Sequence, residues 1–194
     1  MPRRPRDEAA QAIHHVVVQG NGRASIVLDD VDRSDLLRRV ASGCAECSWR
    51  CHAYCLLDTH LHAVLETAEP NLGSGMGRLL GLYAQVFHRR HGTEGHLFRR
   101  PFYSRRVEDE SHLVASCLYV LLNPVVAGLC EHPARWIWCS YEQTVSPGSG
   151  FVYADTLLAS FGADAVRSRS AFRRAVDEAV ARARTKAGVS PRTG

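Results

Sequence analysis

Two short apolar runs, separated by only two polar residues, constrain the fold more than any other feature of this sequence. Residues 50–57 and 60–67 both have the composition of β-strands, and Asp58-Thr59 lies between them. Two strands around so short a polar pair form either a hairpin or a bend. A hairpin runs antiparallel, because a parallel pair needs a crossover connection of a dozen or more residues. In both cases, alternate side chains of each run lie on opposite faces.

The remaining pattern surrounds these two runs with further strands and with helices. The predicted elements are strands at 12–19, 24–28, 50–57 and 60–67, and helices beginning at Asp32, Ser74 (as N-cap) and Asp109 (as N-cap). A connection rich in Gly and Arg, 95–106, precedes the third helix, which must stop before Pro124. The order is strand–strand–helix–strand–strand–helix–strand–helix, without strict alternation, and its fifth strand falls between the second and the third helix. This order predicts an α+β domain with a mostly antiparallel sheet and helices packed on it.

A chain of 194 residues accommodates one ordinary domain and a terminal appendage. We expect a flexible basic N-terminus (1–11), a main domain (12–145), a C-terminal helical extension (146–186) with helices near 153–161 and 168–185, and a disordered tail (187–194). No apolar run reaches the roughly 18 residues of a membrane span, and no secretory stretch follows the basic start. The expected compartment is the cytoplasm, with no membrane partner.

The net charge of +4 is modest, but Lys186 is the only lysine, so nearly all the positive charge is arginine. The planar guanidinium matches phosphate oxygens bidentately, which favours nucleic acid as a partner. A coding bias toward GC-rich codons would give the same composition, so the bias alone does not decide the function.

His60-Leu61-His62 is the sharpest local motif. In a strand, residues i and i+2 point to the same face, so both imidazoles can reach one metal ion while Leu61 faces the core. The alternative is a pair of solvent-facing histidines on a half-exposed strand.

Tyr119 and Asn123 lie one turn apart on the third predicted helix and therefore share a face. A tyrosine on such an apolar helix is usually a core residue, and Asn123 would then cap the helix end before Pro124. The alternative is a chemical role for both side chains.

Seven cysteines are present, four of them within twelve residues: Cys44, Cys47, Cys51 and Cys55. The spacing of the first two, with His52 nearby, raises a zinc site as one interpretation. Because Cys51 and Cys55 lie in an apolar strand-like run, reduced cysteines acting as small hydrophobes are the preferred interpretation.

The connection before the third helix interleaves cations with aromatic rings: Arg99, Arg100, Phe102, Tyr103, Arg105 and Arg106. Cations follow a single-stranded DNA backbone while aromatic faces stack on bases, so this stretch is a candidate DNA-binding segment. The alternative is a solvated basic loop with its aromatic rings in the core.

Six short motifs occur in an order that resembles a known family. They are His14–Asn21 (HHVVVQGN), Ala53–His62 (AYCLLDTHLH), Tyr83–Phe87 (YAQVF), Gly95–Phe98 (GHLF), Tyr119–Leu129 (YVLLNPVVAGL) and Trp138–Tyr141 (WCSY). From about His14 to Tyr141 the chain resembles the REP-associated tyrosine transposases, which belong to the single-tyrosine transposases of the HUH endonuclease class. The resemblance implies their ferredoxin-like (RRM-like) fold.

By this resemblance, His60 and His62 match the metal-binding pair, Tyr119 matches the nucleophile, and Asn123 matches a polar residue that completes the metal site. A tyrosine phenol has a pKa of about 10, so its attack on a phosphodiester needs a cation to stabilise the developing charge. Mg²⁺ or Mn²⁺ is the expected ion. The implied activity is cleavage and rejoining of hairpin-associated single-stranded DNA through a 5′-phosphotyrosine, by a monomer or a homodimer.

Three positions depart from the family pattern: Thr59 and His88 stand where Asn is common, and Pro101 stands where an arginine is common. None of the three removes a catalytic group, but together they leave the DNA specificity and the full activity open. Two alternatives to the transposase therefore stay in view. One is a domesticated protein that binds DNA hairpins without cutting them, and the other is a small zinc-binding interaction domain built on the cysteine cluster.

Overall fold

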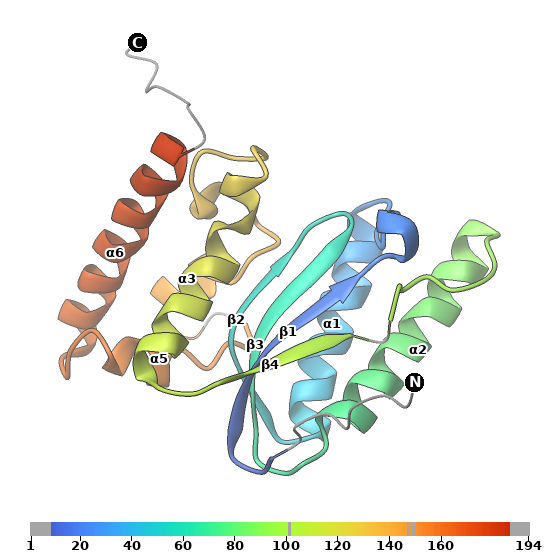
Figure 1. Cartoon of the computed structure of the whole chain (residues 1–194), viewed down its shortest axis with the longest axis horizontal. Coiled ribbons are helices and arrows are strands. Elements are labelled where there is room, and N and C mark those ends of the chain that lie inside the picture. The colour runs from blue at the N-terminus through green and yellow to red at the C-terminus, as the bar shows by residue number, and fades with distance from the viewer. Residues whose placement is uncertain (1–8, 101, 147, 149, 187–194) are drawn as a thin grey trace.

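The centre of the molecule is a four-stranded antiparallel sheet with helices on both faces (Figure 1). The computed structural model describes residues 9–100, 102–146, 148 and 150–186. The strands are β1 (Ala12–Gln19), β2 (Trp49–Leu56), β3 (His60–Thr67) and β4 (Tyr103–Val107), in the order β2-β3-β1-β4. The hairpin, one of the two arrangements predicted from the sequence, is the β2–β3 pair, with Leu56 paired to Leu61 beside the turn.

Three long helices cover the sheet, and the C-terminal region adds more. The helices are α1 (Asp30–Glu46), α2 (Leu72–His91), α3 (Glu110–Val126), α4 (Tyr141–Val145), α5 (Asp155–Ala159) and α6 (Ala165–Lys186), with short 3-10 turns η1 (Asn21–Arg23) and η2 (Pro133–Arg135). The order β1-α1-β2-β3-α2-β4 with this strand arrangement is ferredoxin-like, so the predicted fold class is confirmed. Within the described residues, no helix is both long and apolar enough to cross a bilayer.

The alternation of side chains along the strands, interrupted on β2 by an irregularity between Cys51 and Ala53, produces two separate cores. Val16, Val18 and Leu61 face α1 and α2 in the first core, which continues through the buried faces of both helices. Val64 and Ala53 face α3 in the second core. Figure 1 shows α1 and α2 together on one side of the sheet, and α3, α5 and α6 on the other.

The C-terminal helices are part of the second core. Phe172 and Val176 of α6 are fully buried against the same cluster as Val120 of α3. The backbone N–H of Tyr153 donates to the carbonyl of Cys51 on β2 (2.7 Å), which ties the extension to the sheet. The domain boundary predicted at residue 146 stays a prediction, and the predicted basic N-terminus (except residues 9–11) and tail lie outside the described residues.

The predicted strand at 24–28 is wrong. Ile26 and Val27 are buried in the first core, but their backbone N–H groups both donate to the carbonyl of Asp58 in the β2–β3 turn. The segment therefore seals one end of the sheet as a loop. Its apolar content reflects burial rather than strand pairing.

Two predicted helix starts need correction, and one is confirmed. The first helix begins at Asp30, with Asp29 as N-cap, rather than at Asp32. The second helix begins at Leu72, and its N-cap residue is Asn71 rather than Ser74. Asp109 caps α3 as predicted, its side chain accepting from the N–H of His112 (2.8 Å).

The prediction that α3 stops before Pro124 is also wrong, since the helix runs to Val126. A proline lacks the N–H that would donate to the carbonyl four residues earlier, here Val120. The side-chain Nδ2 of Asn123 donates instead to the carbonyls of Tyr119 (2.8 Å) and Val120 (3.4 Å). This side chain replaces the missing donor, so the helix tolerates the proline.

Candidate active site

The histidine pair lies on the face of the sheet that α3 only partly covers. His60 and His62 alternate with Leu61 on β3, as predicted, and their ring centroids are 4.9 Å apart. Leu61 points into the first core and is 1% exposed, whereas His62 is 6% exposed and His60 is half-buried. The two imidazoles therefore share one face and can approach one ion together.

A third histidine, His15 of β1, joins this pair. Val17 pairs with His62 in the β1–β3 register, which places His15 diagonally beside the pair. Nε2 of His15 and Nδ1 of His62 form a hydrogen bond of 3.1 Å, and the ring centroids are 5.3 Å apart. The sequence predicted no role for His15. Its place beside the histidine pair of β3 depends on strand register, which the sequence did not supply.

Tyr119 approaches the histidines from α3. Its ring centroid lies 5.6 Å from those of both His15 and His62, and its side chain is 55% exposed. Its helix neighbours Val120 and Leu121 point into the second core, so Tyr119 stands at the edge where α3 leaves the sheet uncovered. The interpretation of Tyr119 as a core residue is therefore wrong.

Hydrogen bonds leave the same nitrogen of His60 and of His62 available. Nδ1 of His60 lies 2.9 Å from the hydroxyl oxygen of Thr59, and Nδ1 of His62 faces His15. Nε2 is thus the nitrogen that each ring can offer to an ion. Burial lowers the pKa of His60, and burial with the nearby His60 and His15 lowers the pKa of His62 to about 3. Both rings are then neutral at pH 7, which is the form that binds metals.

Asn123 lies one helical turn beyond Tyr119, but the contacts that the structure shows for it are within its own helix. Because carbonyl oxygens accept both of its hydrogen bonds, its NH₂ group must face the backbone. Its Oδ1 then points away from these two carbonyls. The role of Asn123 as a metal ligand stays a prediction.

The fit of a divalent ion follows from these donors. Two neutral imidazoles suit Mn²⁺ well, while Mg²⁺ prefers oxygen ligands. Within the described part of the chain, no group of three or more His, Cys, Asp or Glu side chains could hold a metal ion. An ion bound by this pair would complete its shell with oxygen ligands.

A small basic pocket adjoins the histidines across β1. It has a volume of about 270 Å³ and is lined by Val17, Gln19, Arg99, Arg100, Phe102 and Tyr103. Val17 pairs with His62 on one side and with Tyr103 on the other, so the pocket and the histidine pair are neighbours. Tyr103 is 57% exposed and offers its ring to a ligand.

The other predicted DNA-binding residues lie on different faces of the sheet. Phe102 is a core residue, 3% exposed, so the prediction that its ring stacks on DNA bases is corrected. Arg105 pairs with His15 across β1–β4 and lies on the histidine face, whereas Arg106 pairs with His14 and points the other way. Arg105, rather than Arg106, lies with the candidate site.

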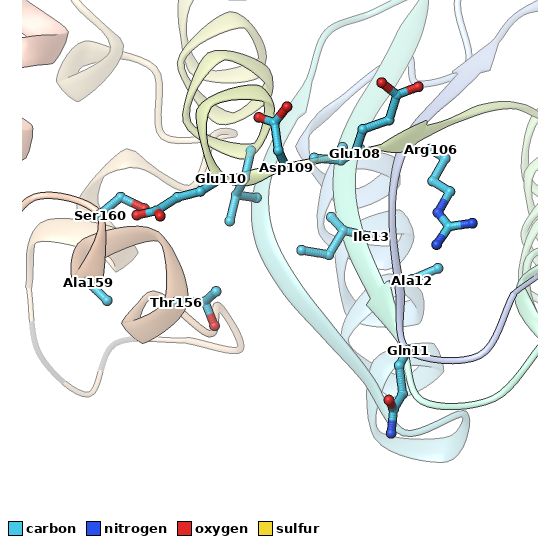
Figure 2. Close-up of a pocket in the computed structure, with 12 residues that line it drawn as sticks. Gln11, Ala12, Ile13, Arg106, Glu108, Asp109, Glu110, Thr156, Ala159 and Ser160 are labelled. Atoms are coloured by element: carbon cyan, nitrogen blue, oxygen red, sulfur yellow. The ribbon is translucent and has the colours of Figure 1, made fainter.

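A second pocket, of about 520 Å³, opens between β1, the start of α3 and α5 (Figure 2). Glu108, Asp109 and Glu110 cluster at its rim, while Arg106 is its basic lining residue. The acidic rim disfavours a phosphate backbone, and the three histidines are not among the lining residues. This pocket is therefore separate from the candidate site.

The cysteine cluster does not form a zinc site. Cys51 is buried in the first core and Cys55 in the second, so their side chains lie on opposite faces of the sheet. Burial raises the pKa of both thiols, which disfavours the thiolate that binds zinc. The interpretation as reduced core cysteines agrees with this geometry.

Comparison with known proteins supports the fold. No protein-family model matches the chain, and no curated protein matches its sequence. Among solved structures, the chain is similar to a REP-associated tyrosine transposase bound to a REP hairpin, with a TM-score of 0.64 and 17% sequence identity. The match covers 76% of this chain and 87% of the other. At this identity, the likeness establishes a shared fold.

Proposed function

We propose that this protein is a metal-dependent single-strand DNA transesterase, a transposase that cleaves and rejoins hairpin-associated DNA. In this proposal Tyr119 is the nucleophile, and His60 and His62 hold Mg²⁺ or Mn²⁺. The observation that carries it is the position of the Tyr119 ring, 5.6 Å from the ring of His62, on a helix that packs on the same face of the sheet as the histidines. Nothing in the packing of the core requires an exposed tyrosine there.

The chemistry follows from the exposed phenol. The Tyr119 oxygen would attack the phosphorus of a phosphodiester and lose its proton, and the bond to the 3′ oxygen would break. The 3′ oxygen leaves as a hydroxyl after gaining a proton, and the DNA stays attached through a 5′-phosphotyrosine. A bound divalent ion would supply polarisation of the phosphate oxygens. Because the phosphotyrosine conserves the energy of the bond, a 3′-hydroxyl can reverse the step and rejoin strands without ATP.

The neighbouring surface suits a single strand entering this site. Tyr103 presents an exposed ring on which a base can stack, and Arg105 lies on the same face beside His15. Arg99 and Arg100 line the pocket on the other side of Tyr103. A strand that crosses β1 would meet these cations before its phosphate reaches Tyr119.

The partner that we propose is a hairpin-forming DNA repeat. The similar solved structure is described as bound to a REP hairpin, and the sequence motifs resemble the same family. A hairpin-binding protein that does not cut would share the basic surface, but it would not need an exposed tyrosine beside two neutral imidazoles. The site geometry therefore favours the cutting enzyme.

The test is a cleavage assay on single-stranded DNA carrying the hairpin repeats that flank the gene, with Mn²⁺ or Mg²⁺. Wild type should form a covalent protein–DNA adduct, and Tyr119→Phe should lower adduct formation at least about 10³-fold, because no other group supplies the nucleophile. Tyr153→Phe is the matched control, since this partly exposed tyrosine lies in the extension, and it should keep the adduct. Tight hairpin binding without an adduct in wild type would instead support the non-cutting alternative.

A further inference from the structure

His15 has no part in the proposed chemistry, although it contacts His62 and Tyr119, two of the residues that would carry it. Its Nε2 lies 3.1 Å from Nδ1 of His62, and its ring packs edge-on against Tyr119 with centroids 5.6 Å apart. The side chain therefore stands between the strand that would hold the ion and the helix that carries the nucleophile.

The hydrogen bond between the two histidines restricts how His62 can bind a metal. A neutral imidazole has one N–H and one nitrogen with a free lone pair, and a metal needs the lone pair. Nδ1 of His62 faces His15, so the ion must approach Nε2. A ring that binds through Nε2 keeps its proton on Nδ1 and donates it, and here the acceptor is Nε2 of His15.

His60 repeats this arrangement with a different partner. Its Nδ1 lies 2.9 Å from the Thr59 hydroxyl, which can accept the same kind of hydrogen bond. Each histidine of the pair thus has an outer hydrogen-bond partner at Nδ1. Such outer partners fix the tautomer and the ring orientation of metal-binding histidines.

We propose that His15 is a positioning residue for the metal site: its Nε2 accepts the hydrogen bond from Nδ1–H of His62 and so directs Nε2 of His62 toward the ion. The inference rests on the proposed function, since it assumes that His60 and His62 hold a divalent ion. It assigns His15 an action through His62 rather than a direct part in the reaction.

A role in packing alone makes a different prediction. Ile13 and Val17 share the face of His15 on β1 and are apolar, so a leucine at position 15 would serve packing as well. Only the hydrogen-bonding role needs an acceptor at the position of Nε2. The amide oxygen of a glutamine reaches a similar position, so His15→Gln keeps the acceptor and His15→Leu removes it.

The experiment measures Mn²⁺ affinity by electron paramagnetic resonance on the full chain without DNA, so that catalysis does not enter. We expect His15→Leu to weaken Mn²⁺ binding about 10- to 100-fold, the usual effect of losing an outer hydrogen-bond partner. His15→Gln should keep most of the affinity. His96→Leu is the matched control, because His96 is an exposed histidine in the connection before β4, and it should bind as wild type does.

Two outcomes would overturn the inference while leaving the proposed function intact. They are wild-type affinity in His15→Leu, and equal weakening by Leu and Gln. If wild type itself binds no Mn²⁺, or His60→Ala binds as well as wild type, the proposed metal site fails and this inference fails with it. Nitrogen chemical shifts of His62 in the metal-free wild type give a reading without any variant. A proton on Nδ1 supports the inference, and a proton on Nε2 refutes it.

Discussion

The two faces of the sheet are built from the same strands, but one packs into an apolar core and the other carries the histidines. On one face Val16, Val18 and Leu61 meet α1 and α2 in a continuous apolar core. On the other, His15 and His62 stand where those strands pass beyond the cover of α3. Adjacent residues of one strand thus belong to different environments, because successive side chains point to opposite faces.

The difference lies in how completely helices cover each face. Two long helices cover the first face, so most strand residues there are buried in the first core. On the second face α3 makes the main helix contacts with the strands among the described residues, and its exposed Tyr119 marks the edge of the covered area. On β3, Leu61 therefore contributes to stability, while its direct neighbours His60 and His62 belong to the proposed site. Substitutions on the two faces should affect different measurements.

Neighbouring alanine substitutions on β3 test this separation most strongly. Leu61→Ala should lower the free energy of unfolding by about 2–5 kcal/mol, because it leaves a cavity in the sealed core. The variant should still bind Mn²⁺ while it is folded. His60→Ala should change the stability by less than about 1 kcal/mol and weaken Mn²⁺ binding at least about 100-fold. Urea titration and Mn²⁺ binding measure the two effects, and a large stability loss in His60→Ala would show that the faces are not separate.

Metal removal should affect only the face of the sheet that carries the histidines. Chelation with EDTA should abolish adduct formation, while the protein stays folded, because both cores consist of apolar side chains and contain neither His60 nor His62. At an ion concentration of 100 times the dissociation constant, binding adds only about 2.7 kcal/mol of stability. Circular dichroism and thermal melting with and without EDTA provide the measurement. Unfolding on chelation would instead fit a domain that depends on structural zinc.

The smallest expected effect concerns the cations beside the site. Arg105→Ala should weaken single-stranded DNA binding a few-fold and reduce the slope of log affinity against log salt by about 0.7, the value for one phosphate contact. Arg38→Ala is the matched control, because this arginine lies on α1, behind the sealed face, and pairs with Asp35. Fluorescence anisotropy at several salt concentrations measures both slopes. Equal slopes for the two variants would place the DNA elsewhere.

Much of this arrangement could be predicted from the sequence because it depends on local periodicity. The alternation in His60-Leu61-His62 predicted which residues share a face, and the one-turn spacing of Tyr119 and Asn123 predicted a shared helix face. The two-residue connection predicted a hairpin or a bend, and the structure shows the hairpin. These inferences needed no information on how distant segments meet.

The parts that were missed depend on long-range contacts. His15 joins the site through the β1–β3 register, and Ile26 and Val27 lose their strand character because Asp58 captures their N–H groups. Phe102 is buried while Tyr103 beside it is exposed, which depends on the face that each side chain meets. The continuation of α3 through Pro124 needed a side chain, Asn123, to replace a backbone donor.

The packing of α3 has a consequence for the kinetics of the reaction. This helix is held between the sheet and α6, and it brings Tyr119 to the histidines of its own chain. On the proposed function, a single polypeptide would supply both the nucleophile and the ion-binding pair. The rate of adduct formation per molecule, with DNA in excess, should therefore be independent of protein concentration, so that diluting the enzyme lowers the amount of product but leaves the turnover of each molecule unchanged.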